Sequence, residues 1–77
     1  MEEEWRSRIV VDRMVLAGKP IIKDTRIAVE LILELLANGW TVEEILKNYP
    51  QLRKEDITAA PKYAINVLRE ERVHPLT

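Results

Sequence analysis

The chain has 77 residues, no cysteine and one histidine, and its 12 basic and 13 acidic side chains give a net charge of −1. A chain of this length forms one domain with a small core, to which an oligomer or a bound partner would add buried apolar area. The composition excludes disulfides, thiolate catalysis and cysteine-based zinc sites. The near-zero charge argues against strong independent DNA binding, for which a basic excess is usual.

The first residues predict a location in the cell. Met1 is followed by three glutamates, whereas a signal peptide begins with basic residues. No apolar run approaches the ~18 residues of a membrane span. We therefore expect a cytoplasmic protein that does not bind a membrane. Trp5 can pack on its own domain or on a partner.

Residues 9–27 predict a short β arm. Ile9–Val11 and Ile21–Ile22 are β-branched runs, and Arg26–Ile27 extends the pattern as a third strand-like piece. Asp24 lies in the turn between the last two pieces, where a left-handed backbone conformation is expected. Strands this short leave open edges that favour pairing with a second copy.

A first helix is predicted from Ala28 to about Asn38. Apolar residues recur there at helical spacing, at Val29, Ile32, Leu33 and Leu36. A second stripe, Leu31 and Leu35, makes the helix apolar beyond one face. The extra stripe can contact a neighbouring subunit or the N-terminal strands. Gly39 suits the left-handed position that ends a helix.

The second and third helices have different boundary signals. Thr41 and Glu44 form a capping box that begins a helix of about two turns, and Pro50 closes it. A third helix is expected from Lys54, with a kink or break at Pro61, followed by an extended tail over residues 70–77. Its predicted core positions are Ile57, Ala60, Ala64, Ile65 and Leu68.

The second and third helices, joined by the linker 50–53, have the proportions of a helix-turn-helix unit. Glu55 and Asp56, at the start of the third helix, would be repelled by a phosphate backbone, so a solvated charged face is the alternative to DNA contact. The residues that could contact base edges or phosphates are Lys54, Thr58, Lys62, Asn66 and Arg69.

No set of residues predicts catalysis. The carboxylates Asp12, Asp24, Glu30 and Glu34 are scattered among lysines and arginines, and no motif spacing brings three of them together as a metal site requires. The chain has no nucleophile beside a base and no glycine-rich phosphate loop. We expect no enzyme activity, no metal and no cofactor.

Six sequence blocks resemble the family catalogued as domain of unknown function 433. The blocks are Gly18-Lys19-Pro20, Thr25-Arg26-Ile27, Gly39 to Leu46, Tyr49 to Leu52, Glu55-Asp56-Ile57 and Tyr63-Ala64. The resemblance implies a mainly α fold, a three-helix homeodomain-like helix-turn-helix domain with a short N-terminal β arm. Within one domain, 1–77, we expect the arm at 9–27, the helical core at 28–72 and a tail at 73–77. Arg13, Asp24, Ala28, Arg53 and Pro61 depart from the family pattern, and Arg53 stands where a Thr or Ser would cap the third helix.

The resemblance also implies a function. Members of the family are regarded as antitoxin-like partners of small nucleases with a PIN-like fold. We therefore expect a homodimer built by the arm and the first helix, with residues from about 62 to 76 covering a nuclease toxin. The alternative is a DNA-binding helix-turn-helix regulator, including one that binds the operator of its own operon. A third option is a structural dimer module with an unrelated ligand. The residues expected at the partner or dimer interface are Ile9, Val11, Ile21, Arg26, Leu31, Leu35, Val73 and Leu76.

Overall fold

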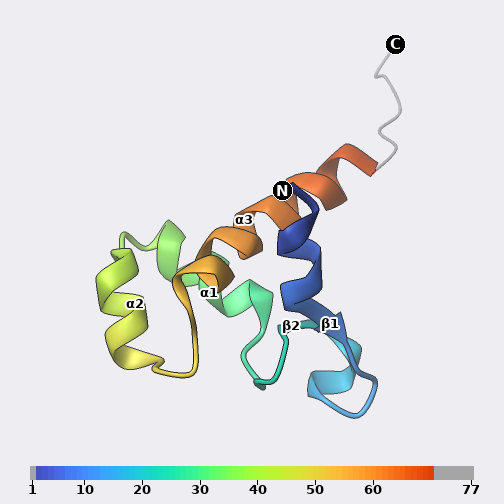
Figure 1. Ribbon diagram of the computed structural model, residues 1–77, viewed down its shortest axis with the longest axis horizontal. Helices are drawn as coiled ribbons and strands as arrows, with labels where there is room; N and C mark the ends of the chain where they lie inside the picture. Colours follow the sequence, from blue (N-terminus) through green and yellow to red (C-terminus); the bar gives the residue numbers. More distant parts are fainter. Residues whose placement is uncertain (1, 71–77) are drawn as a thin grey trace.

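The computed structural model describes residues 2–70, with side chains from Trp5 onward, and within this range the protein is mainly helical. The three expected helices and the hairpin are confirmed (Figure 1). Glu70, expected in the tail, is the last residue of α3. The expectations for the rest of the tail, including Val73 and Leu76, lie outside the described residues. In chain order the elements are the 3₁₀ helix η1 (Glu2–Arg8), β1 (Ile9–Val11), the 3₁₀ turn η2 (Leu16–Gly18), β2 (Pro20–Ile22), α1 (Val29–Ala37), α2 (Val42–Asn48) and α3 (Lys54–Glu70).

The two strands form an antiparallel hairpin in which Ile9 lies opposite Ile22, Val10 opposite Ile21 and Val11 opposite Pro20. The third piece expected at Arg26–Ile27 is not a strand. The chain there makes one isolated bridge, between Ile21 and Ala28, and the Ile22 N–H donates to the Ile27 carbonyl at 2.9 Å. The ladder goes no further because α1 begins at Val29, directly after the bridged residue.

That turn is held by local hydrogen bonds. Asp24 has a φ of 65°, which confirms its expected left-handed conformation. The Thr25 hydroxyl donates to the Ile22 carbonyl at 2.8 Å and accepts from the Ile27 N–H at 3.0 Å. These bonds bring Ile27 back beside β2.

The core lies where α1 meets β2, α2 and α3. Val29, Ile32 and Leu35 are the buried residues of α1, whereas Leu33 and Leu36, expected on the core face, are half-buried at its margin. Leu35 is covered because α1 contacts elements on more than one side. Part of the extra apolar stripe therefore packs within the chain itself. The buried cluster comprises Ile22, Ile27, Val29, Ile32, Leu35, Ile45, Leu52, Ile57 and Ala60.

The predicted helix boundaries around α2 are confirmed. The Glu44 N–H donates to the Thr41 hydroxyl at 3.1 Å, and the Thr41 N–H donates to the Glu44 carboxylate at 2.8 Å, which completes the capping box. Gly39, just beyond α1, has a φ of 89°.

Pro61 lies inside α3 and does not break it, since the helix is continuous from Lys54 to Glu70. The missing N–H of Pro61 would have donated to the Ile57 carbonyl. Ala59 and Ala60 are fully buried just before it, so packing on both sides holds the helix together at this point.

Two core predictions on α3 are wrong. Ile65 is 47% exposed and Leu68 is 65% exposed. The C-terminal half of α3 projects past α1 and α2, as Figure 1 shows. The apolar spacing therefore continues after the elements that could cover it have ended.

Replacing Gly39 with alanine is expected to lower the free energy of unfolding by about 1–2 kcal/mol, because an L-residue at positive φ brings its Cβ too close to the backbone. A Cβ at Gly39 would meet no other atom within 4 Å, so the loss arises from the backbone conformation alone. Urea unfolding followed by circular dichroism measures it. Gly39→Asn is the control and should lose less, since asparagine tolerates this conformation. Equal losses for both variants would contradict the assignment.

Candidate functional site

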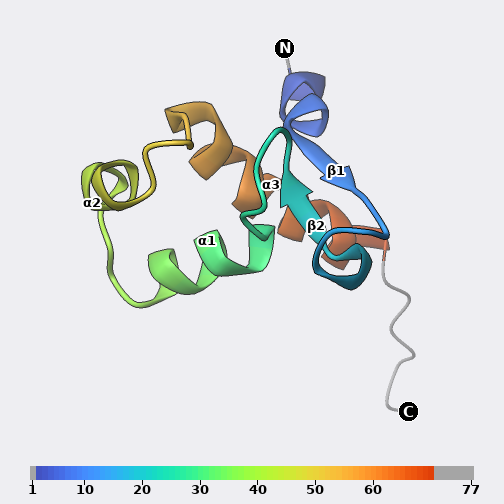
Figure 2. The ribbon, with the colours of Figure 1, turned by 90° about the horizontal axis from the view of Figure 1, so that it is seen from below.

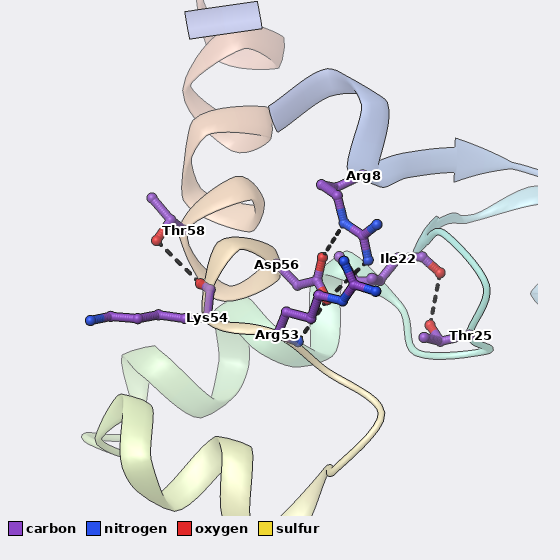
Figure 3. A network of polar contacts seen from close by, with 7 residues as sticks. All are labelled: Arg8, Ile22, Thr25, Arg53, Lys54, Asp56 and Thr58. Carbon is purple, nitrogen blue, oxygen red and sulfur yellow. Dashed lines mark hydrogen bonds and ion pairs between the residues drawn. The ribbon is translucent and has the colours of Figure 1, made fainter. Parts of the chain in front are cut away.

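A buried carboxylate connects the start of α3 to the N-terminal helix η1. Asp56, at the start of α3, is 0% exposed. It accepts a hydrogen bond from Arg8 Nε at 2.6 Å and a longer one from Arg8 Nη2 at 3.4 Å. The Arg53 backbone N–H donates to the second carboxylate oxygen at 2.8 Å. Figure 3 shows both donors converging on Asp56 from η1 and from the α2–α3 linker.

Each of these bonds has a physical role. The carboxylate of Asp56 reaches back to the N–H that precedes the helix, as the acidic residue of a capping box does. Its negative charge also lies at the positive end of the helix dipole. Arg8 neutralises that charge, and the hydrogen bond to Asp56 raises the pKa of Arg8 above its ordinary value. A carboxylate removed from water is stable only with such partners.

Two expectations change with this geometry. The sequence pattern predicts that Asp56 faces a phosphate backbone, but its side chain points inward and is paired. Arg53 lacks the hydroxyl that would cap the third helix, which predicts a weak helix start. Its backbone N–H instead donates to the carboxylate of Asp56, so a side chain from within the helix caps this end.

The candidate DNA-contacting residues do not all share one environment. Lys54, Thr58, Lys62 and Arg69 are exposed on one side of α3, although Thr58 donates to the Lys54 carbonyl of its own helix at 3.4 Å. Asn66 is half-buried beside η1. With its side-chain amide oriented to satisfy both atoms, its oxygen accepts from Arg6 Nη2 at 3.0 Å and its nitrogen donates to Glu70 at 3.3 Å.

A shallow groove of about 490 Å³ is lined by residues of η1 and of the first half of α3. Trp5 lines it and is half-buried, with the Arg6 guanidinium 4.5 Å from its ring centroid. Its lining mixes charged, polar and aromatic groups: Trp5, Ser7, Arg8, Glu55, Thr58, Ala59 and Lys62.

A second groove, called here the α3 groove, is predominantly apolar. It has a volume of about 460 Å³ and lies between the start of α1, β2 and the C-terminal half of α3. Val67 is 43% exposed and Leu68 is 65% exposed along its wall. Its rim carries an exposed ion pair, in which Lys19 Nζ lies 3.3 Å from Glu30. The residues lining it are Lys19, Pro20, Val29, Glu30, Leu33, Tyr63, Ala64, Val67 and Leu68.

The candidate interface residues fall into three groups. Val11 (62% exposed) and Arg26 lie at the surface, and Ile9 and Leu31 are half-buried against the core. Ile21 is 3% and Leu35 is 9% exposed, so the chain itself covers these two side chains. Val73 and Leu76 lie outside the described residues.

The sequence patterns do not point to the α3 groove. Pro20, Val67 and Leu68 come together there from β2 and α3, whereas helical spacing assigns Leu68 to the core. One signal is present. The apolar spacing of the third helix continues for two turns beyond Ala60. The core of a 77-residue chain is too small to bury apolar side chains over that length.

The described side chains contain no group of three His, Cys, Asp or Glu residues close enough to hold a metal ion. No helix within residues 2–70 is long and apolar enough to cross a membrane.

Architecture places the protein among small, mainly helical domains that carry a two-stranded N-terminal hairpin. Residues 9–64 match the family described as Protein of unknown function (DUF433), and the chain belongs to this family. The 2.00 Å crystal structure of a DUF433 member protein from Anabaena variabilis ATCC 29413 is similar, with a TM-score of 0.75 and 29% identity over 90% of this chain and 68% of that chain. No curated protein matches the sequence. The resemblance found in the six sequence blocks is thus confirmed.

Replacing Arg8 with methionine is expected to lower the free energy of unfolding by about 3 kcal/mol, because it leaves the Asp56 carboxylate buried with its charge unpaired. Lys19→Met is the matched control, since it breaks the exposed pair with Glu30 and should cost less than about 1 kcal/mol. Urea unfolding of both variants measures the difference. If the two losses were equal, the Arg8–Asp56 pair would have no special structural role.

Proposed function

We propose that this protein is an antitoxin-like binding protein, whose α3 groove receives apolar side chains of a small nuclease with a PIN-like fold. The observation that carries the proposal is the uncovered apolar stripe on the C-terminal half of α3, formed by Val67 and Leu68 beside the groove. The nuclease as partner rests on the family resemblance of the sequence blocks.

The character of this surface favours a protein partner. Burying the exposed part of Leu68 would contribute about 1–2 kcal/mol. Protein interfaces have apolar centres with charged groups at the rim, and the Lys19–Glu30 pair lies at the rim of the groove. A net charge of −1 adds no long-range attraction to phosphates. Neutralising a nuclease by covering it requires no catalytic group.

Leu68→Asp is expected to weaken binding to the nuclease encoded beside this gene by about tenfold or more, because it places a charge at the apolar centre of the contact. Leu68 is mostly exposed, so the change should leave the fold intact. Thr58→Asp is the control, since it adds the same charge on another side of α3. Co-expression, affinity purification and titration measure the effect, with relief of nuclease toxicity as a second readout. Purification of the wild-type chain without the neighbouring product would contradict the proposal.

A second candidate function is DNA binding by α2 and α3 as a homeodomain-like helix-turn-helix unit. Asp56 favours it, since its charge is buried and paired and does not oppose a phosphate. Lys54, Lys62 and Arg69 then form a basic row along α3. Glu55 and Ile65 interrupt this side, and Asn66 is engaged with Arg6. We therefore rank this function second.

If DNA is bound, Lys62→Ala should weaken the complex with the upstream operon DNA and reduce the slope of log K against log salt by about 1, the share of one phosphate contact. Lys47→Ala, an exposed lysine on α2, is the control and should leave the slope unchanged. Mobility-shift titrations at several salt concentrations measure both. Absence of a shift at low salt would remove this candidate.

A further inference from the structure

The two edges of the hairpin differ in how they are covered. On the outer side of β2, the Ile22 N–H donates to Ile27 and Ile21 bridges to Ala28, so the returning chain occupies that edge. No other strand of the described residues lies along β1, whose partner in the sheet is β2. Figure 2 shows β1 at the margin of the molecule with β2 on its inner side. The sheet therefore has one open edge.

The hydrogen bonds identify which backbone groups face that edge. The Lys23 N–H donates to the Arg8 carbonyl, so Arg8 and, two residues on, Val10 direct their backbone groups toward β2. Ile9 lies opposite Ile22, whose N–H points away toward Ile27. By the alternation of an antiparallel ladder, Ile9 and Val11 direct their N–H and C=O groups outward.

This arrangement is complementary to itself. Two β1 strands related by a two-fold axis run antiparallel, and their outward groups meet when Ile9 of each copy lies opposite Val11 of the other. That register uses both outward residues of both strands and places Val10 opposite Val10 of the second copy. Shifting it by two residues would bring Arg13 or Ser7 against the strand and lose a pair of bonds.

We propose that β1 is a homodimer interface, in which two copies of the chain pair antiparallel through β1, with Val10 on the two-fold axis, to form one four-stranded sheet. The side chains support this occupant. Val10 is 37% exposed and Val11 is 62% exposed, and the strand Ile9–Val11 carries no charge or proline of the kind that protects edges.

This interface lies outside the α3 groove and does not depend on the nuclease proposal. It also changes the role of the exposed strand. β1 closes the fold of its own chain on one side through Val10 and is free to bind on the other through Ile9 and Val11.

The register is tested by opposite charges at one position. Sedimentation equilibrium of the wild-type chain should show a dimer, and Val10→Lys and Val10→Glu should each weaken self-association by about tenfold, because like charges then face each other across the axis. An equimolar mixture of the two variants should recover the wild-type dimer. Because Val10 is partly exposed, neither charge is forced into the core. Self-association that both charges leave unchanged would overturn the proposal, as would a monomeric wild-type chain.

A backbone test separates the edge from other surfaces. Val11→Pro removes an outward N–H that the β1–β2 ladder does not use, since Val11 lies opposite Pro20 in a pair without mutual hydrogen bonds. Val11→Thr keeps the N–H and is the control. Proline should give a monomer at concentrations where the threonine variant and wild type are dimers, with all three retaining the same circular dichroism spectrum. If the Val11→Pro variant remained a dimer like the Val11→Thr variant, the proposed pairing would be overturned.

Discussion

The Arg8–Asp56 ion pair is the interaction on which the rest of the structure depends. Burying a carboxylate costs several kcal/mol unless charge and hydrogen bonds compensate it. Asp56 accepts hydrogen bonds from the Arg8 guanidinium on both carboxylate oxygens and from the Arg53 backbone N–H on one of them. One side chain thereby begins α3, holds η1 against it and fixes where β1 leaves η1. An apolar pair could fill the same space, but it would specify neither the start of the helix nor the partner of Arg8.

The pair also determines which sides of α3 remain at the surface. η1 covers the side that includes Ala59 and Asn66, and α1 packs on the side that includes Ile57 and Ala60. Lys54, Thr58 and Lys62 remain on the solvent side. The α3 groove lies where the start of α1 and β2 meet the C-terminal half of α3, and α3, with 17 residues against 9 in α1, extends beyond them. Where a helix extends beyond the elements packed on it, the apolar stripe that is buried in one turn becomes exposed in the next.

The features that could be predicted from sequence depend on residues close together in the chain. The capping box needs Thr41 and Glu44 only, and the left-handed positions of Asp24 and Gly39 follow from residue type and local context. The errors concern residues whose environment is set from a distance. Asp56 turns inward because it pairs with Arg8, which is 48 residues away in the sequence. Leu68 is exposed because α1, whose first residues line the α3 groove, does not extend over the C-terminal end of α3. The spacing of apolar residues along the chain does not indicate which distant residues will cover a side chain. The sequence therefore predicts the helices and the hairpin, but not which side chains of α3 are buried.

The sequence separation of the ion pair has a consequence for synthesis. Arg8 and Asp56 are 48 residues apart, and contacts between distant residues form late because long loops must close first. During translation Arg8 emerges long before Asp56, and η1 and the hairpin have no helix to dock on until α3 has left the ribosome. The two-stranded hairpin is marginal by itself. Folding of the N-terminal third is thus coupled to completion of the chain, and a product truncated before Asp56 would lack the anchor for η1 and β1.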